Sequence, residues 1–130
     1  MPRFGTRSTL VLMSLDERLR NIFYEVIKEF DCSILCGHRG KEEQDYYFHN
    51  GLSKRSFPNS KHNVSPSLAI DVAPYPIDWD DERRFYLLAG YVLATANRLH
   101  IPLRMGCDWD GDMDLKDQNF HDLPHFEIDT

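Results

Sequence analysis

Two histidines and an aspartate have the residue types and the setting of a metal site. Asp71 lies inside an apolar run at 69–73 (AIDVA). An ionised carboxylate in a buried strand is costly unless a cation or a full set of hydrogen-bond donors meets it. His62 precedes this run in a polar loop, and His125 lies near the end of the chain. Catalytic zinc takes three His or Asp/Glu ligands and keeps a fourth position for water. We therefore expect one zinc ion on His62, Asp71 and His125.

A second carboxylate is placed for acid–base chemistry. Asp122 precedes His125 across a Leu-Pro bend, which puts it near the metal without making it a ligand. A carboxylate in that position can accept the proton of a metal-activated water. Two alternatives stay open: Glu127 competes for this role, and His121 is a rival metal ligand. Pro124 argues against a continuous helix that would present His121 and His125 on one face.

Arg39 is a candidate for contact with the substrate. It follows the strand-like segment 32–36, and side chains at strand ends often project into a site. The guanidinium offers a fixed fork of donors to a carboxylate or to a developing oxyanion. A plain surface charge is the alternative interpretation.

The acidic loop 108–114 suggests a different cation. It carries aspartates at alternate positions, 108, 110, 112 and 114. The loop departs from an EF-hand because its sixth position is Met113 rather than Gly and its twelfth is Asn119 rather than Glu. The pattern gives Ca²⁺ only partial support.

The elements that must carry these residues include both helices and strands. Helical spacing of apolar residues predicts helices over roughly 15–30, 40–50 and 79–99. Short apolar or alternating runs predict strands at 32–36, 69–73, 101–105 and near 125–128. Ser14 and Glu17 form a capping box for the first helix, and residues 1–13 are expected to be a loosely held arm. The expected fold class is α+β, a small, mostly antiparallel central sheet packed with helices.

Composition narrows the classes of function. A chain of 130 residues with 42% hydrophobic residues fits a single domain, 1–130, with its own core. The net charge of −6 gives no support to nucleic-acid binding, and no apolar run approaches the roughly 20 residues of a membrane span. The N-terminus lacks a signal-peptide pattern, so synthesis in the cytoplasm is expected. Cys32, Cys36 and Cys107 are expected to be reduced structural thiols.

Three segments match the pattern of a known family. Ser60-x-His62 and Ala69-x-Asp71 are similar to the two halves of its zinc signature, and 122–127 (DLPHFE) is similar to its closing motif. The chain thereby resembles the zinc peptidases of peptidoglycan that include D-alanyl-D-alanine carboxypeptidases, and most of all the phage endolysins of the L-alanyl-D-glutamate endopeptidase type. The spacer between His62 and Asp71 is longer than in the shorter family signature.

The resemblance implies a D-alanyl-D-alanine peptidase or Hedgehog-like fold with one Zn²⁺ per chain. It implies Asp122 and Arg39 as catalytic residues, and Gln44 and Ser60 as substrate-binding residues. The implied substrate is bacterial peptidoglycan, cut at a stem-peptide bond, with L-Ala-D-Glu favoured. A monomer made in the host cytoplasm would act on the cell wall, in the periplasm or outside. The alternatives are a D-Ala-D-Ala carboxypeptidase, a non-catalytic cell-wall or virion module on the same fold, and a glycosidase with paired carboxylates.

Overall fold

The fold is built from short helices around a small sheet. A computed structural model describes residues 2–116 and 121–130. Within them the elements are, in chain order, α1 (Thr6–Leu12), α2 (Glu17–Val26), β1 (Cys32–Cys36), α3 (Lys41–His49), the 3₁₀ turn η1 (Lys61–Asn63), β2 (Ala69–Pro74), α4 (Glu82–Arg98), β3 (Leu103–Met105) and β4 (His125–Ile128). The predicted α+β class is confirmed.

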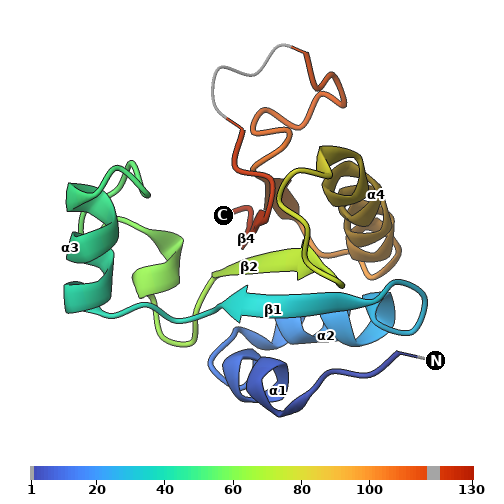
Figure 1. Ribbon diagram of the computed structural model, residues 1–130, viewed down its shortest axis with the longest axis horizontal. Coiled ribbons are helices and arrows are strands. Elements are labelled where there is room, and N and C mark those ends of the chain that lie inside the picture. Colours follow the sequence, from blue (N-terminus) through green and yellow to red (C-terminus); the bar gives the residue numbers. More distant parts are fainter. Residues whose placement is uncertain (1, 117–120) are drawn as a thin grey trace.

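The sheet order is β1-β2-β4-β3, and each neighbouring pair is antiparallel. β2 is therefore a central strand, as its apolar run predicted. Its register places Asp71 opposite His125 on β4. Helices α1, α2 and α4 lie around the sheet, whereas α3 stands apart beyond η1 (Figure 1).

Strand alternation separates a core face from a site face. Ile70 and Val72 are fully buried in the hydrophobic core, where Phe126 of β4 meets Phe23 of α2 edge to face at 5.7 Å between ring centroids. Full burial of such side chains contributes about 1.5–3 kcal/mol each. Asp71 lies between these two apolar residues in sequence, so it points to the opposite face. The core thus holds the strand that presents the carboxylate.

The expectation of a loosely held arm at 1–13 is wrong. Residues 6–12 form α1, and Leu12 is fully buried. The hydroxyl of Ser8 accepts a hydrogen bond from the backbone N–H of Ile34 on β1 at 3.0 Å. A helix this short gains its stability from packing rather than from its own periodicity, which is why the sequence pattern missed it.

The expected start of the next helix is also corrected. Asp16, not Ser14, caps α2, and its carboxylate accepts from the N–H of Arg18 at 2.9 Å. The Ser14 hydroxyl instead donates to the Val11 carbonyl and accepts from the N–H of His38. Ser14 therefore ties the end of α1 to the segment that follows β1. Helix α4 starts at Glu82, later than the expected 79.

No helix in residues 2–116 and 121–130 is long and apolar enough to cross a membrane.

Candidate metal centre

The centre lies where β2, β4 and η1 meet. Oδ1 of Asp71 is 3.2 Å from Nδ1 of His125 and 3.4 Å from Nε2 of His62. The two imidazole rings are 5.2 Å apart between centroids, at 69° to each other. The three residues expected to bind zinc are therefore brought together, with both rings directed at one carboxylate oxygen.

Local hydrogen bonds hold η1, and with it His62. The Ser60 hydroxyl accepts from the N–H of His62 at 3.2 Å, and Asn63 Oδ1 accepts from the N–H of Ser60 at 3.0 Å. This reciprocal pair is a capping box on a single turn. The N–H of Arg39 donates to the His62 carbonyl at 2.7 Å. The turn is thereby joined to the segment after β1.

In each histidine, the hydrogen bond made by one ring nitrogen determines whether the other nitrogen can bind a metal. His62 Nδ1 lies 2.8 Å from the Gly37 carbonyl, an acceptor, so Nδ1 carries the proton and Nε2 keeps a lone pair. His125 Nε2 lies 2.8 Å from Glu127 Oε1, so the lone pair is on Nδ1. His62 Nε2 is buried and has no well-formed hydrogen bond within the described part of the chain. Both lone pairs thus face Asp71, and the donor set fits zinc.

The titrating groups of the centre shift one another's pKa values. Burial opposes the charge on Asp71, but contacts with His125 and His62 outweigh it and hold the pKa of Asp71 well below its usual range. Burial likewise lowers the pKa of His62, yet contacts with Asp71 and Cys36 raise it to about 10. These pKa shifts favour a proton on each ring nitrogen that faces Asp71, and a bound cation would replace those protons and take up the lone pairs described above.

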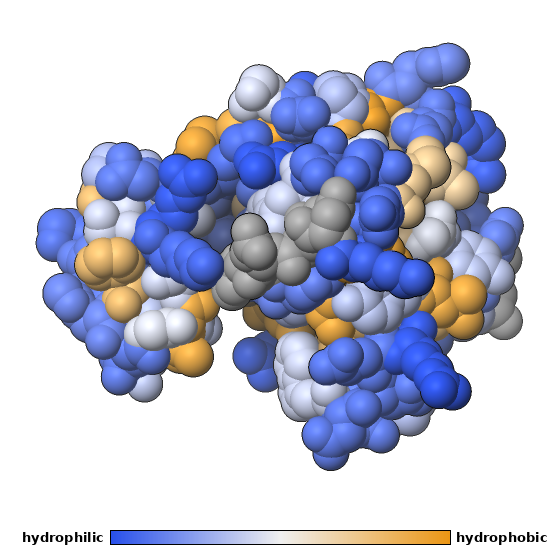
Figure 2. All heavy atoms as spheres, turned by 90° about the horizontal axis from the view of Figure 1, so that it is seen from above, coloured by the Kyte–Doolittle hydropathy of each residue, from blue (hydrophilic) through white to orange (hydrophobic). Residues whose placement is uncertain are grey.

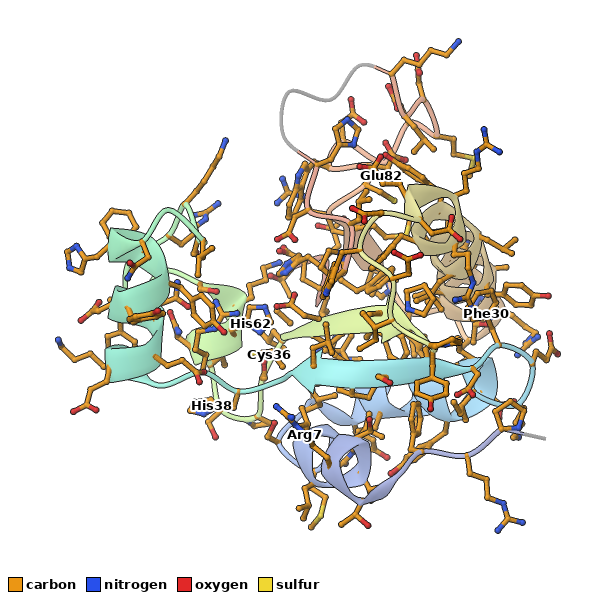
Figure 3. The ribbon with its side chains drawn as sticks, viewed as in Figure 1. Arg7, Phe30, Cys36, His38, His62 and Glu82 are labelled. Atoms are coloured by element: carbon orange, nitrogen blue, oxygen red, sulfur yellow. The ribbon has the colours of Figure 1, made fainter. Side chains whose placement is uncertain are left out.

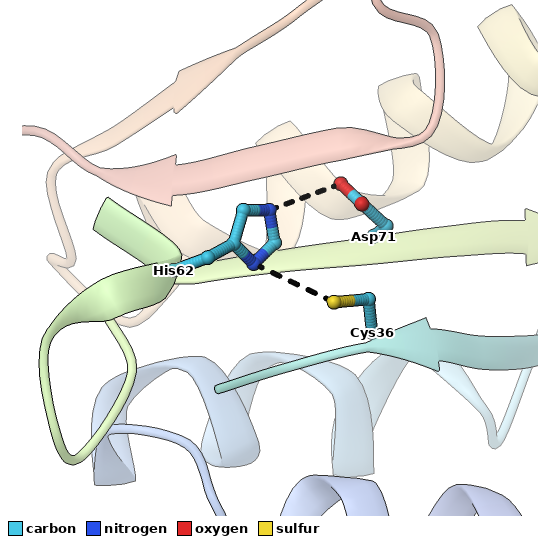
Figure 4. A group of neighbouring side chains, drawn as sticks. All are labelled: Cys36, His62 and Asp71. Carbon is cyan, nitrogen blue, oxygen red and sulfur yellow. Dashed lines mark hydrogen bonds and ion pairs between the residues drawn. The ribbon is translucent and has the colours of Figure 1, made fainter. Parts of the chain in front are cut away.

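Cys36 is a residue of this centre that sequence reasoning missed. Its Sγ is 3.9 Å from His62 Nδ1, and Cys36, His62 and Asp71 each offer a ligand atom within 4.8 Å of the others. Figure 4 shows Asp71 and Cys36 facing different nitrogens of the His62 ring. Because Nδ1 already donates to Gly37, the free Nε2 favours a metal on the Asp71 side. All three cysteines are free, as expected.

A cleft of about 380 Å³ opens over this centre. Asp122, Arg39 and Ser60 line it together with the three candidate ligands. In Figure 3, His62 and Cys36 lie toward the interior, whereas His38 lies on the outside. Figure 2 views the molecule from above. Hydrophilic residues cover most of this face, which is indented next to the α3 lobe at the left. Burial, together with repulsion from Asp71, raises the pKa of Asp122, as suits a proton acceptor.

Arg39 lies at the wall of the cleft and is held there by several side-chain contacts. Its side chain is only 7% exposed, Nη2 lies 3.4 Å from Asp71 Oδ2, and its guanidinium stacks over the Tyr47 ring at 4.2 Å. Nη1 donates to Gln44 Oε1 at 3.0 Å. Gln44 itself is fully buried and donates to Ser53 and to the Arg55 carbonyl. The structure therefore places Gln44 behind Arg39, which differs from the expected contact with substrate.

The alternatives from the sequence occupy other positions. His121 is exposed, with Nδ1 3.5 Å from the Tyr86 hydroxyl. Glu127 is bonded to His125, as described above. The acidic loop brings Asp108, Asp110 and Asp112 together, each with a carboxylate oxygen within 4.8 Å of the others. Acidic groups gather in this way without an ion, so Ca²⁺ stays a prediction. The loop's expected twelfth position, Asn119, lies outside the described residues.

Comparison with known proteins identifies the family. A family model described as phage L-alanyl-D-glutamate peptidase matches residues 1–128. The chain belongs to this family. The L-alanyl-D-glutamate peptidase of Escherichia phage T5 is 27% identical over 134 residues, which cover 97% of this chain and 97% of the relative. The crystal structure of the Serratia marcescens L-Ala D-Glu endopeptidase ChiX matches 98% of this chain and 90% of its own, with a TM-score of 0.77 and 22% identity.

These matches confirm the resemblance to phage endolysins and the class of enzyme, a peptidoglycan peptidase. The likeness to the Serratia structure shows that the fold is shared. A metal and roles for individual residues are proposed from the geometry of this chain itself.

Gly106 allows the segment with Asp122 to approach β4. The Gly106 N–H donates to the His125 carbonyl at 2.8 Å, and the Asp122 N–H donates to the Gly106 carbonyl at 3.0 Å. A Cβ at this position would overlap the backbone carbonyl of Asp122. We expect Gly106→Ala to displace Asp122 and to lower kcat of the peptidase roughly 100-fold, the order of loss from an ångström-scale misplacement.

The measurement is the rate on purified peptidoglycan at saturating substrate, with zinc content and unfolding midpoint recorded in parallel. Gly90→Ala is the matched control, because a Cβ on that helical glycine meets nothing within 4 Å. Equal rates for the two variants would show that the approach of Asp122 does not depend on Gly106.

Proposed function

We propose that this peptidase is a zinc endopeptidase that hydrolyses the L-Ala-D-Glu bond of peptidoglycan stem peptides, as a phage endolysin. The observation that carries the zinc assignment is the convergence of two imidazole lone pairs on Asp71, beside Asp122 and in a cleft. Family membership supports the bond that is cut. Asp71, His62 and His125 are the proposed ligands, and an open fourth position suits catalysis rather than a structural site.

Asp122 is the proposed general base and acid. A Zn²⁺ ion on the three ligands would supply a Lewis acid for the scissile carbonyl and make a bound water more acidic. Asp122 accepts a proton from the attacking water as the oxygen bonds to the carbonyl carbon of L-Ala. It then donates this proton to the nitrogen of D-Glu as the C–N bond breaks. The products are a carboxylic acid and a free amine, and the acid's remaining proton passes to the amine or to solvent.

Arg39 is the proposed partner of the charge that develops on the carbonyl oxygen, or of a substrate carboxylate. Its contacts with Gln44 and Tyr47 fix its direction before substrate arrives, and such preorganised donors cost little reorganisation during the reaction. Gln44 is therefore proposed as a positioning residue for Arg39. Ser60, which caps η1 and lines the cleft, stays a predicted substrate contact.

The charge of the cleft walls supports an acidic substrate. The cleft lining has more basic side chains than carboxylates, in a chain whose net charge is −6: Arg39, Lys54, Arg55, Lys61 and Arg104 against Asp71, Asp122 and Glu127. A concave basic surface raises the local concentration of anions. A stem peptide that contains D-Glu carries carboxylate groups and fits this field.

The test is digestion of purified peptidoglycan followed by mass spectrometry of the fragments. We expect new amino groups at D-Glu, loss of the reaction with a chelator, and recovery on addition of Zn²⁺. Release of terminal D-Ala would instead indicate a carboxypeptidase. Chelator-resistant lysis with new reducing sugars would indicate a glycosidase. A protein that binds zinc and wall material but releases no fragment would be a non-catalytic module.

The remaining expectations stay predictions: one catalytic domain over 1–130, a monomeric state, synthesis in the host cytoplasm and action at the cell wall. Gel filtration with light scattering of the purified protein measures the oligomeric state directly.

A further inference from the structure

One ion pair joins the two segments that carry the histidines. Lys61 is the neighbour of His62 in η1, and Glu127 follows His125 on β4. Lys61 Nζ lies 3.0 Å from Glu127 Oε2, and it also donates to the Ile128 carbonyl. The side chains are 26% and 10% exposed, respectively. The pair therefore lies mostly out of water, directly beside the candidate ligands.

The two oxygens of Glu127 have different partners. Oε1 accepts the Nε2–H of His125 at 2.8 Å, and Oε2 faces Lys61. Arg104 Nη1 lies farther away, 3.8 Å from Oε2. The carboxylate of Glu127 is therefore held from both sides, by the Nε2–H of His125 on one oxygen and by the ammonium of Lys61 on the other.

The two histidines differ in the group that accepts a hydrogen bond from the ring nitrogen facing away from Asp71. His62 donates to a neutral carbonyl, that of Gly37, whereas His125 donates to a carboxylate. A carboxylate behind a ligating imidazole fixes its tautomer and makes the metal-bound nitrogen more basic. A lysine that pairs with this carboxylate keeps it in place and ties the His62 turn to the same strand.

We propose that Lys61 and Glu127 are positioning residues that assemble the metal centre, with Glu127 presenting Nδ1 of His125 and Lys61 holding η1 against β4. This inference rests on the proposed zinc site. The pair takes no part in acid–base chemistry. Its role is to bring together two ligand segments that are far apart in sequence. The pair Lys41–Asp45 on α3, also a lysine–carboxylate contact, is more exposed and lies away from the centre, so it has no such task.

The test measures the zinc dissociation constant by competition with a chromophoric chelator, without substrate. We expect Glu127→Gln, which keeps an acceptor but loses the charge, to bind zinc about 10–100-fold more weakly. Lys61→Met, which keeps the aliphatic stem, is expected to weaken binding by a smaller factor. The double variant is expected to lose less than the sum of the two, since the residues act as a unit. The control Lys41→Met/Asp45→Asn is expected to keep the wild-type affinity.

A spectroscopic measurement separates positioning from general stability. In ¹⁵N-labelled, zinc-loaded wild-type protein, His125 is expected to show a protonated Nε2 and a metal-bound Nδ1. The unfolding midpoint of each metal-free variant checks folding, and Lys61→Met keeps the test available if Glu127→Gln fails to fold.

Several results would overturn the inference. Zinc affinity of Glu127→Gln within twofold of wild type, strictly additive losses, or a His125 ring protonated at Nδ1 would each do so. Stoichiometric zinc in wild type, together with unchanged affinity in the variants, would overturn this inference and leave the proposed function intact. Absence of zinc binding by the wild-type protein would overturn both.

Discussion

Asp71→Ala is expected to abolish stoichiometric zinc binding and to reduce hydrolysis of peptidoglycan to the background rate. Asp71 is the one anion among the three proposed ligands, and both imidazole rings are directed at its Oδ1. Without it, two imidazoles face each other in a buried site, and a divalent cation there would have no anionic ligand to offset its desolvation. The measurement is the zinc-to-protein ratio after dialysis, together with the initial rate of fragment release.

The control is Asp45→Ala, which removes a carboxylate from the exposed pair on α3. It is expected to leave the zinc ratio and the rate unchanged. Retention of stoichiometric zinc by Asp71→Ala would contradict this prediction. Cys36 and His62 would then be the ligands to consider, since the Cys36 thiol lies close enough to share a metal with His62. Cys36→Ser separates the two arrangements, because it is expected to keep zinc if Asp71 is a ligand and to lose it otherwise.

The sequence was sufficient for the strand that presents Asp71. A charged residue inside an apolar run of alternating faces predicted both β2 and the direction of the carboxylate, and β2 is indeed central with Ile70 and Val72 in the core. The pairing of β2 with β4 was not predictable in the same way. It depends on the sheet order β1-β2-β4-β3, in which strands distant in sequence become neighbours. That pairing is what places His125 opposite Asp71.

Sequence patterns did not predict the positions of the side chains that support the site. Gln44 was expected at the substrate, yet it is buried behind Arg39, because α3 turns its polar residue inward to meet the guanidinium. Cys36 lacked any spacing typical of a metal ligand and still lies beside His62. These contacts arise where separate segments meet, so no local periodicity encodes them. The family resemblance pointed to the proposed ligands, but not to the groups that orient them.

Asp122→Ala is expected to keep zinc and to lower kcat by roughly 10²–10⁴-fold, the usual value of general acid–base catalysis. Asp122 lines the cleft with the ligands but belongs to the segment before β4, so its loss leaves the donor set of the metal intact. Its raised pKa, caused by burial and by the charge of Asp71, makes it a stronger base than an exposed aspartate. The measurement pairs kcat and KM on a defined stem peptide with the zinc ratio.

The contrast between Asp122→Ala and Asp71→Ala is what distinguishes the base from a ligand. Loss of turnover with zinc retained identifies a proton-transfer group, whereas parallel loss of both would make Asp122 part of the metal site. Near-normal turnover would transfer the role to another carboxylate, and Glu127 is the closest alternative from the sequence. Protonation of Glu127 would weaken its contacts with His125 and Lys61, which lower its pKa to about 2 against the effect of burial. A group that is so weak a base is poorly suited to take a proton from water, and Asp122, with its pKa shifted the opposite way, is the better candidate.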